Sequence, residues 1–258
     1  MPASAASALA RAKERGHRLF ICTGRSAPEV YPRFFDLGFE GIVGGAGGYA
    51  AVGSTVLLDE RMPAEHVQAL TRMWEELDAF YVWQGPDQMG PSRGYLDFFV
   101  PRAGENPQDW VEYGESVTPF VVDIEGGSFT KVTAYVRPEN ASMERISAAL
   151  PDGYRAIIGS VGAAGYVPFE VLPTRLSKAV GIEAVCEHLG IPLSRSVAIG
   201  DSNNDVEAVA RAGVGISIGD GCEALVEVAD IVAPAVGDDG FAWALAAAGL
   251  IDEAPNPA

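Results

Sequence analysis

Short apolar runs alternate with segments of helical spacing at both ends of the 258-residue chain. A helix is predicted at residues 4–15, and apolar runs at 18–22 and 197–199 predict buried strands. The same alternation predicts strands at 41–43, within 214–221 and at 230–234, and helices at 27–37, 179–189, 206–212, 223–228 and 241–248. Such alternation is typical of a parallel sheet with helices on both faces. The two ends of the chain therefore predict an α/β fold built on a doubly wound parallel sheet.

The pattern changes between residues 62 and 168, where strand-like segments follow one another with few helices between them. Helices are predicted at 63–77 and 139–150, and segments rich in aromatic and β-branched residues predict strands at 79–83, 94–100, 120–124, 131–136, 154–160 and 165–171. Consecutive strands are typical of an α+β module. We predict a core domain of residues 1–61 and 169–258 with an α+β cap domain, 62–168, inserted in it. Two aromatic loops, around 83–86 and 106–110, are candidates for substrate contact or for packing.

Composition narrows the possible functions. Eighteen basic and thirty-five acidic residues give a formal net charge of -17, which disfavours binding to nucleic acid or to anionic membranes. The three cysteines form neither a Cys-x-x-Cys pair nor a disulfide framework, as expected of thiols in a reducing compartment. The Ala-rich start lacks the regions of an export signal, and no apolar run approaches membrane-spanning length. We therefore predict a cytoplasmic protein in which local cations hold any anionic ligand.

Two familiar phosphate-binding arrangements are excluded. The glycine-rich turn at 44–50 is followed by a hairpin-like segment in place of the helix whose N-terminus would receive a pyrophosphate. Cys22 and Arg25 are separated by only two residues, which is too few for the phosphate loop of a cysteine phosphatase.

Acidic and amide side chains gather after the apolar run at 197–199. Gly200 ends the run, and Asp201, Asn204 and Asp205 follow where the predicted strand passes into a helix. Ligands of open α/β sheets lie outside the carboxyl ends of strands, and carboxylates placed there suit an oxygen-seeking cation such as Mg2+. Asp and Asn are also common helix N-caps, so this stretch alone leaves both interpretations open.

Polar groups also mark two other junctions. Thr23, Gly24 and Arg25 follow the first predicted strand, where backbone N–H groups, a hydroxyl and a guanidinium suit a phosphate, unless the Thr-Gly pair is an ordinary turn. Ser177 is a predicted N-cap, which places Lys178 on the first turn of a helix. A cation is unfavourable at that end of the helix dipole. Lys178 therefore indicates either an anion nearby or a surface lysine with its ammonium group in water.

Three motifs occur in a fixed order along the chain. They are Ile21-Cys-Thr-Gly-Arg25, Leu176-Ser-Lys178 and Ile199-Gly-Asp-Ser-Asn-Asn-Asp205, with the α+β insert between the first and the second. This ordered set, which spans nearly the whole chain, resembles the haloacid dehalogenase superfamily of phosphatases. It is most similar to the Cof-type branch, which has a large α/β cap. The resemblance implies a Mg2+-dependent phosphatase of small phosphorylated metabolites such as sugar phosphates, with the cap closing over the substrate to exclude water.

The resemblance also implies roles at the phosphate. Family members attack phosphorus with an Asp carboxylate and form an aspartyl phosphate that water hydrolyses. Thr23 and the amide of Gly24 would bind a phosphoryl oxygen, and Arg25 would contact the substrate beside them. Lys178 would offset charge on both the nucleophile and the phosphate, so Lys178 and Thr23 are the expected catalytic residues.

Three residues of the last motif have implied roles at the metal. Asp201 would ligate Mg2+, and Asp205 would support the metal site from behind. Asn204 would position the phosphate or Lys178. Mg2+ and Lys178 together would let a protein of charge -17 hold a phosphate ester.

The sequence departs from the family at its start. Relatives begin with a strand ending in Asp-x-Asp-Gly-Thr, which supplies the nucleophile and the acid/base, whereas the first aspartate here is Asp36. Asp36 follows a predicted helix and is expected at the wrong end of the sheet to replace it. We expect a natural protein that begins upstream of Met1, with the missing strand between those ending at Thr23 and Asp201, and a chain without it that does not turn over substrate. The alternatives are a noncatalytic relative that binds phosphorylated ligands and a pure interaction module with a relic site.

Overall fold

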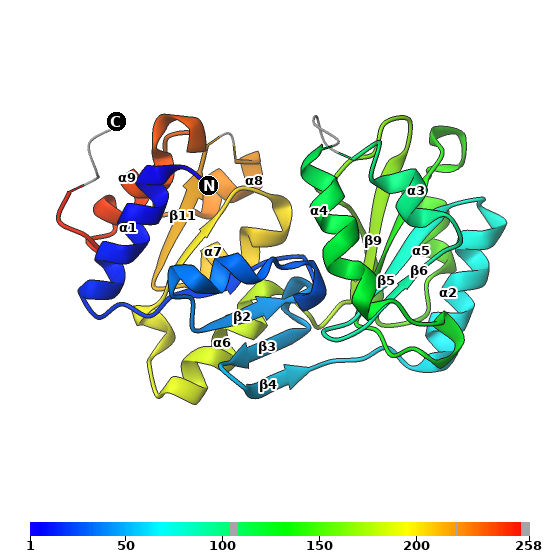
Figure 1. The fold of residues 1–258 in the computed structure, drawn as a ribbon, viewed down its shortest axis with the longest axis horizontal. Helices are drawn as coiled ribbons and strands as arrows, with labels where there is room; N and C mark the ends of the chain where they lie inside the picture. The colour runs from blue at the N-terminus through cyan, green and yellow to red at the C-terminus, as the bar shows by residue number, and fades with distance from the viewer. Residues whose placement is uncertain (104–107, 220, 254–258) are drawn as a thin grey trace. The chain divides into compact units, whose positions relative to one another are not determined.

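The chain forms two compact units. The computed structural model describes residues 1–103, 108–219 and 221–253 (Figure 1). Unit 1 comprises Met1–Gly24, Pro32–Leu58 and Ser177–Ala258, and unit 2 comprises Arg25–Tyr31 and Asp59–Leu176. These units are defined by their contacts alone, so the predicted boundaries between a core domain and a cap domain stay a prediction. The contacts assign three segments of the predicted core, 25–31, 59–61 and 169–176, to unit 2.

Unit 1 contains two sheets. The first has the order β1 (Phe20–Cys22), β2 (Gly41–Gly44), β3 (Tyr49–Val52) and β4 (Thr55–Asp59), with β1 and β2 parallel and β3 antiparallel to β2. The second has the parallel strands β10 (Val197–Gly200), β11 (Val214–Ile218) and β12 (Ile231–Ala233). Among the described strands, β1 and β10 each pair along one edge only.

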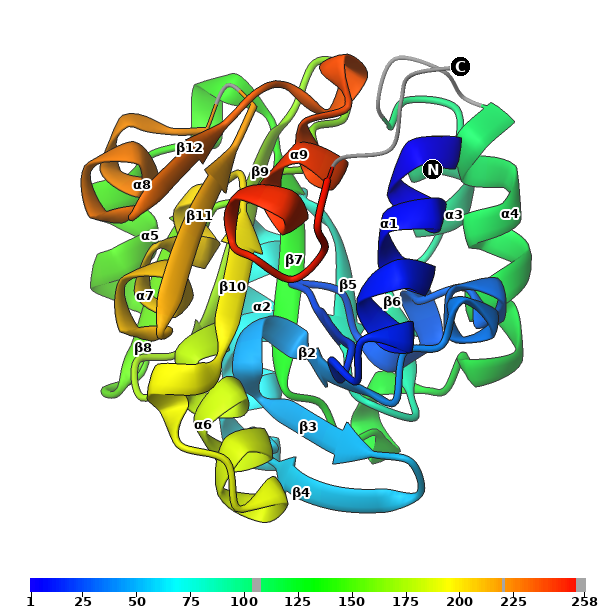
Figure 2. The same cartoon turned by 90° about the vertical axis from the view of Figure 1, so that its left-hand side faces the viewer.

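Helices on both faces hold the two sheets of unit 1 in one layer. On one face, α1 (Ala3–Glu14) packs against α9 (Gly240–Ala247), and both Leu19 beside β1 and Ile199 of β10 pack into their cluster (Figure 2). On the other face, α6 (Lys178–Leu189) supplies Ile182, which packs with the cluster under β2 and with the cluster under β10. The predicted α/β class is confirmed, with a break in the sheet layer between β1 and β10.

The remaining helices of unit 1 follow the predicted alternation closely. α7 (Val206–Arg211) follows β10, and α8 (Glu223–Val228) lies between β11 and β12. α6 ends at Gly190, whose left-handed backbone (φ 64°) is the glycine C-cap that the sequence predicts. None of the helices in the described part of the chain is long and apolar enough to cross a membrane.

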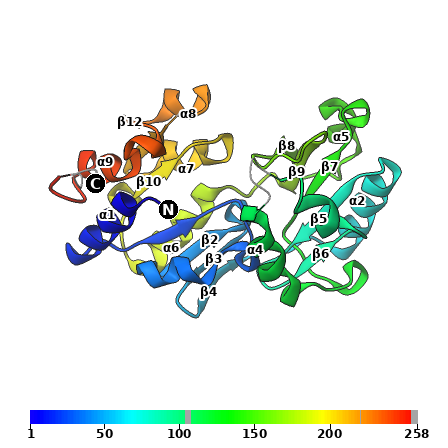
Figure 3. The ribbon, with the colours of Figure 1, turned by 45° about the horizontal axis from the view of Figure 1, so that its top comes forward.

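Unit 2 is built on a five-stranded antiparallel sheet. Its order is β6 (Met89–Pro91), β5 (Phe80–Gln84), β7 (Lys131–Val136), β9 (Val167–Pro173) and β8 (Tyr154–Ile158) (Figure 3). Neighbouring residues of a strand point to opposite faces. Trp83 therefore packs with α2 (Ala64–Glu76) and α5 (Met143–Ala149) on one face. Val82 packs on the other face, with α3 (Tyr95–Phe99) and α4 (Gln108–Val117).

Two predicted strands of unit 2 are wrong. Residues 94–100 form the helix α3, because Tyr95, Phe98 and Phe99 recur at spacings of three and four and meet one aromatic cluster on a single helix face. Residues 120–124 lie between two 3-10 turns, Thr118–Phe120 and Ile124–Gly126, and the valines there are exposed. β6 and α4 were not predicted. The loop expected at 106–110 therefore runs into α4, and its residues 106 and 107 lie outside the described part.

The predicted helix at 27–37 is also wrong. The chain forms two 3-10 helices, Ala27–Glu29 and Pro32–Leu37, with Val30 extended between them. Pro32 has no N–H to continue a helix, and the residue before a proline is disfavoured in the helical region. A capping box between Ser26 and Glu29 closes the first turn by itself.

Candidate active site

The turn after β1 is fixed by its backbone. The Thr23 N–H donates to the Val43 carbonyl (2.8 Å), and the Ala46 N–H donates to the Thr23 carbonyl (3.3 Å). A Cβ added to Gly24 would lie 3.2 Å from Nδ2 of Asn204. The end of β1 and the loop after β10 are therefore neighbours, as expected when two parallel strands have their carboxyl ends at the same edge.

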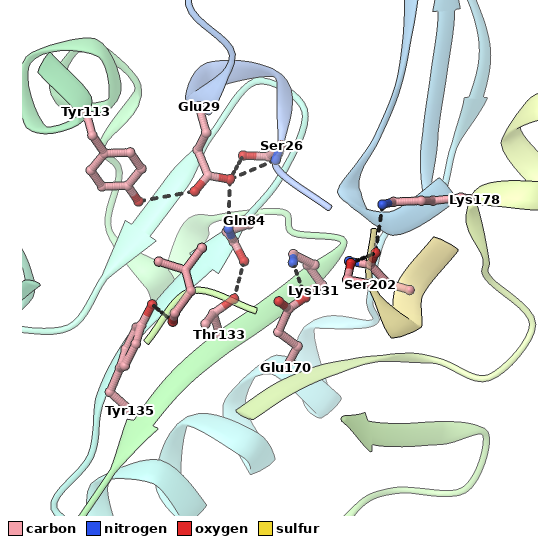
Figure 4. A network of polar contacts seen from close by, with 12 residues as sticks. Ser26, Glu29, Gln84, Tyr113, Lys131, Thr133, Tyr135, Glu170, Lys178 and Ser202 are labelled. Atoms are coloured by element: carbon pink, nitrogen blue, oxygen red, sulfur yellow. Dashed lines mark hydrogen bonds and ion pairs between the residues drawn. The ribbon is translucent and has the colours of Figure 1, made fainter. Parts of the chain in front are cut away.

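Lys178 joins the last two sequence motifs. Its Nζ donates to Oδ1 of Asn204 (2.8 Å) and to Oδ1 of Asp205 (2.6 Å), and the residue is 5% exposed (Figure 4). Lys178 is therefore not a surface lysine, and the anion that its position on α6 indicates is the Asp205 carboxylate. The resemblance implies that Asn204 positions the phosphate or Lys178, and this contact shows that Asn204 and Lys178 meet.

Asp205 is buried and fully engaged. Besides Lys178, its carboxylate accepts hydrogen bonds at Oδ2 from the N–H groups of Asp201 and Ser202 (both 3.2 Å), and Oγ of Ser202 lies 3.1 Å away. Gly200 makes room for it, because a Cβ there would lie 2.3 Å from Cβ of Asp205. Asp205 is thus a helix-capping residue and the counter-ion of Lys178, so the capping interpretation holds for Asp205, and its place at a metal site stays a prediction.

The amide of Asn204 has a defined orientation. Its Oδ1 accepts from Lys178, which can only donate, and lies 2.9 Å from Oγ of Ser202. The Nδ2 group is therefore on the side of Gly24. Asn204 presents N–H donors next to the backbone of the Thr-Gly turn, beside the Lys178 ammonium group.

The metal-binding capacity of these residues is partial. Asp201 is exposed, and its carboxylate has no hydrogen-bond partner among the described residues, whereas the oxygens of Asp205 are occupied. The described residues include no group of three or more His, Cys, Asp or Glu side chains able to hold a metal ion. Mg2+ often uses one or two carboxylates and completes its shell with water and phosphate oxygens. The residues present therefore fit a Mg2+ site that needs further ligands.

Two alternative nucleophiles do not fit. Asp36 is exposed on the turn before β2 and lies near its amino end, where the Glu40 N–H donates to the Leu19 carbonyl; this confirms the expected position away from Thr23. Part of the Cys22 surface is accessible to solvent, but desolvation of the thiol by the protein atoms packed around it raises its pKa to about 12, an effect that the charge of Lys178 opposes. A thiol with that pKa is protonated at neutral pH and is a poor nucleophile.

Arg25 lies in unit 2, where aromatic rings hold it. Its guanidinium carbon is 5.3 Å from the centroid of the Trp110 ring and 5.9 Å from that of Tyr31, and Nη1 donates to the Glu29 carbonyl (3.2 Å). Of the two aromatic loops, the first supplies packing, because Trp83 is fully buried. Sequence reasoning did not identify Glu29, although the Ser-x-x-Glu pattern of a capping box marks it.

Comparison with known proteins gives a consistent result. Residues 1–245 match the sequence profile of the haloacid dehalogenase-like hydrolase family. A putative phosphatase, YkrA, of Bacillus subtilis (strain 168) is 25% identical over 251 residues, which are 97% of this chain and 92% of the relative.

Solved structures with the same fold cover nearly all of the chain. A hypothetical protein from Geobacillus kaustophilus HTA426 has 26% identity and a TM-score of 0.75, over 97% of this chain and 93% of that one. A sugar phosphatase of haloacid dehalogenase subclass IIB has 21% identity and a TM-score of 0.76, over 97% and 93%, and at that identity the likeness shows the fold alone.

Proposed function

Because the chain belongs to the haloacid dehalogenase-like hydrolases, we propose that it carries the phosphate site of a Mg2+-dependent phosphatase. The proposed substrates are small phosphorylated metabolites such as sugar phosphates. The observation that carries the proposal is the buried contact of Lys178 with Asn204 and Asp205, beside the Thr-Gly turn. This contact brings one cation and several N–H donors to the carboxyl ends of two strands.

The residues of unit 1 have distinct tasks at the phosphate. The Thr23 hydroxyl, the Gly24 N–H and the Asn204 amide would donate to phosphoryl oxygens, and Lys178 would offset their charge. Donors fixed before the reaction stabilise the developing charge without having to reorganise. Asp205 keeps Lys178 in place, and Arg25 would contact the rest of the substrate.

Asp201 is the residue that would hold Mg2+. When bound, the ion would polarise a phosphoryl oxygen and neutralise part of its charge. Asp205 would support Asp201 indirectly, because its Oδ2 accepts the Asp201 N–H and so fixes the backbone at that residue. Water and the phosphate would complete the shell together with any further carboxylate.

We propose that the nucleophile is a carboxylate on a strand that these 258 residues do not supply. β1 and β10 lie in one layer with unpaired edges, and their carboxyl ends are neighbours. A parallel strand added between them would end beside Lys178 and would fill a space of about 10 Å, or two strand spacings. It would also satisfy backbone groups that are costly to leave unpaired.

A second candidate function is noncatalytic binding of a phosphorylated ligand. It is favoured by the contact of Lys178 with Asn204 together with the lack, before Thr23, of the Asp-x-Asp with which family members attack phosphorus. The two candidates share the phosphate site and differ only in turnover.

Turnover with and without an added strand distinguishes the two functions. The 258-residue chain and a version extended at its N-terminus by a strand ending in Asp-x-Asp would be assayed with Mg2+ on a panel of sugar phosphates. We expect turnover only from the extended chain and its loss in Asp201→Asn, with Asp36→Asn as the matched control that keeps it. Turnover by the short chain that depends on Asp201 would show that another residue attacks the phosphate. Phosphate binding without turnover by either chain would favour the binding function.

A further inference from the structure

The Thr-Gly turn continues directly into a segment that belongs to unit 2. The chain leaves unit 1 after Gly24 and returns to it at Pro32, and the seven residues between them, Arg25–Tyr31, have their contacts in unit 2. This segment carries one short 3-10 helix, Ala27–Glu29. What holds this segment therefore acts on the residues that directly follow the Thr-Gly turn in the chain.

Glu29 holds this segment. Its Oε2 accepts from the backbone N–H of Ser26, from Oγ of Ser26 and from Nε2 of Gln84, each at 2.7 Å, and its Oε1 accepts from Oη of Tyr113 at 3.2 Å (Figure 4). The residue is only 4% exposed. Four donors from three residues on three different elements therefore converge on one buried carboxylate.

The donors of Glu29 are themselves fixed. Gln84 is on β5, and its Oε1 accepts from Oγ1 of Thr133 on β7 (2.8 Å), so the network reaches the middle of the sheet. Tyr113 is on α4, within the aromatic cluster that packs on the same face of the five-stranded sheet as α3. Because hydrogen bonds are directional, these donors fix the position of the Glu29 carboxylate in more than one direction, whereas hydrophobic packing alone does not.

The link from Glu29 to the phosphate turn is short. The anchored Ser26 N–H is separated from Gly24 by Arg25 alone, and consecutive Cα atoms are about 3.8 Å apart. Arg25 is held in addition by the rings of Trp110 and Tyr31. The Glu29 anchor therefore acts on the backbone two residues from Gly24 along the chain.

We propose that Glu29 is a positioning residue, which holds the Thr23–Arg25 turn in its phosphate-binding conformation through Ser26, Gln84 and Tyr113. The proposal rests on the phosphate role of that turn. Through this network, the geometry at the phosphate depends on residues of the β5–β7 sheet and of α4 that do not touch the phosphate. A carboxylate needed only for the stability of unit 2 would have no such effect.

Hydrogen exchange of the ligand-free full chain tests the anchor itself. In Glu29→Gln the new amide group would face donors, and in Tyr113→Phe one donor is lost. We expect amide exchange in residues 23–31 to become about fivefold faster in Tyr113→Phe, the effect of one hydrogen bond, and still faster in Glu29→Gln. Tyr81→Phe is the matched control, because it removes a hydroxyl that donates to Glu75 in the same unit without touching this segment.

Binding of inorganic phosphate with Mg2+, measured by calorimetry, tests the consequence. Both variants should weaken phosphate binding, by about tenfold in Glu29→Gln, whereas Tyr81→Phe should leave the affinity unchanged even where it lowers the melting temperature. Faster exchange in 23–31 with unchanged phosphate affinity would overturn the positioning role, and unchanged exchange would overturn the anchor. If the wild-type chain binds no phosphate, the proposed function fails at this site, and the exchange data alone still decide whether Glu29 anchors the turn.

Discussion

The buried pair of Lys178 and Asp205 gives the sharpest test of the site. Asp205→Asn keeps the shape of the side chain and one acceptor oxygen, but its amide group would face the Lys178 ammonium group at the position where Oδ1 now lies 2.6 Å away. Both residues are buried, with 5% and 6% of their surface exposed, so water cannot replace the lost partner. Removing one partner of a buried pair costs about 3–5 kcal/mol of unfolding free energy.

Replacing Lys178 should lower the free energy of unfolding by less than replacing Asp205. Lys178→Met removes the cation and leaves Asp205 with the N–H groups of Asp201 and Ser202 as donors. We expect about 1–3 kcal/mol for this loss. The double variant should be more stable than Asp205→Asn alone, because no unpaired cation then remains buried.

Urea unfolding of the wild-type chain, both single variants and the double variant measures these free energies. A control is the exposed pair of Arg18 and Glu40 in the same unit, with side chains 39% and 37% exposed. Glu40→Gln should change the unfolding free energy by at most about 1 kcal/mol. If Asp205→Asn cost no more than Glu40→Gln, the ion pair would be solvated and the reasoning about the site would be wrong.

Three further predictions concern residues around this pair. Gly200→Ala should lower the unfolding free energy by about 1–3 kcal/mol, because its Cβ would lie 2.3 Å from that of Asp205; an unchanged urea midpoint would contradict the packing. Gly24→Ala should weaken phosphate binding about tenfold and leave the melting temperature unchanged, because its Cβ would lie 3.2 Å from Nδ2 of Asn204. Calorimetry measures the affinity, and a large drop in melting temperature would instead show a folding defect. Alkylation of Cys22 by iodoacetamide, followed by peptide mass spectrometry, should accelerate about tenfold per pH unit between about pH 8 and 10. Only the thiolate reacts and the pKa of the thiol is about 12, so a plateau in the rate near pH 9 would refute the raised pKa.

The sequence predicts well those parts of the fold that local signals specify. Gly190 marks the end of α6, and the apolar run before Gly200 gives β10, because glycine caps and short apolar runs depend on neighbours in the sequence. Of the two interpretations that the position of Lys178 left open, an anion nearby and a surface lysine, the structure shows the anion. The family motifs also imply that Asn204 and Lys178 lie together, which their hydrogen bond shows, whereas the phosphate site itself stays a prediction.

The parts that the sequence does not predict depend on distant partners. Glu29 meets Gln84 and Tyr113, which are 55 and 84 residues away, so no local pattern reveals the network. Residues 94–100 look like a strand by composition, and only the aromatic cluster that receives Phe98 selects a helix. The break in the sheet layer, by contrast, is one that the family resemblance predicts, because the strand expected between β1 and β10 is missing from the sequence and the two strands do not pair with each other.

The passage of the chain through unit 2 at residues 25–31 also constrains how unit 2 can be exchanged with the matching part of a relative. A chimera that exchanges only the long segment 59–176 with a relative would leave Glu29 among foreign side chains. In the reciprocal chimera, which carries 59–176 of this chain, Gln84 and Tyr113 would lack Glu29, the acceptor of their hydrogen bonds. Each buried donor left without a partner costs about 1–3 kcal/mol. A stable exchange therefore has to move the seven residues that follow the Thr-Gly turn together with the larger segment, as one unit of recombination.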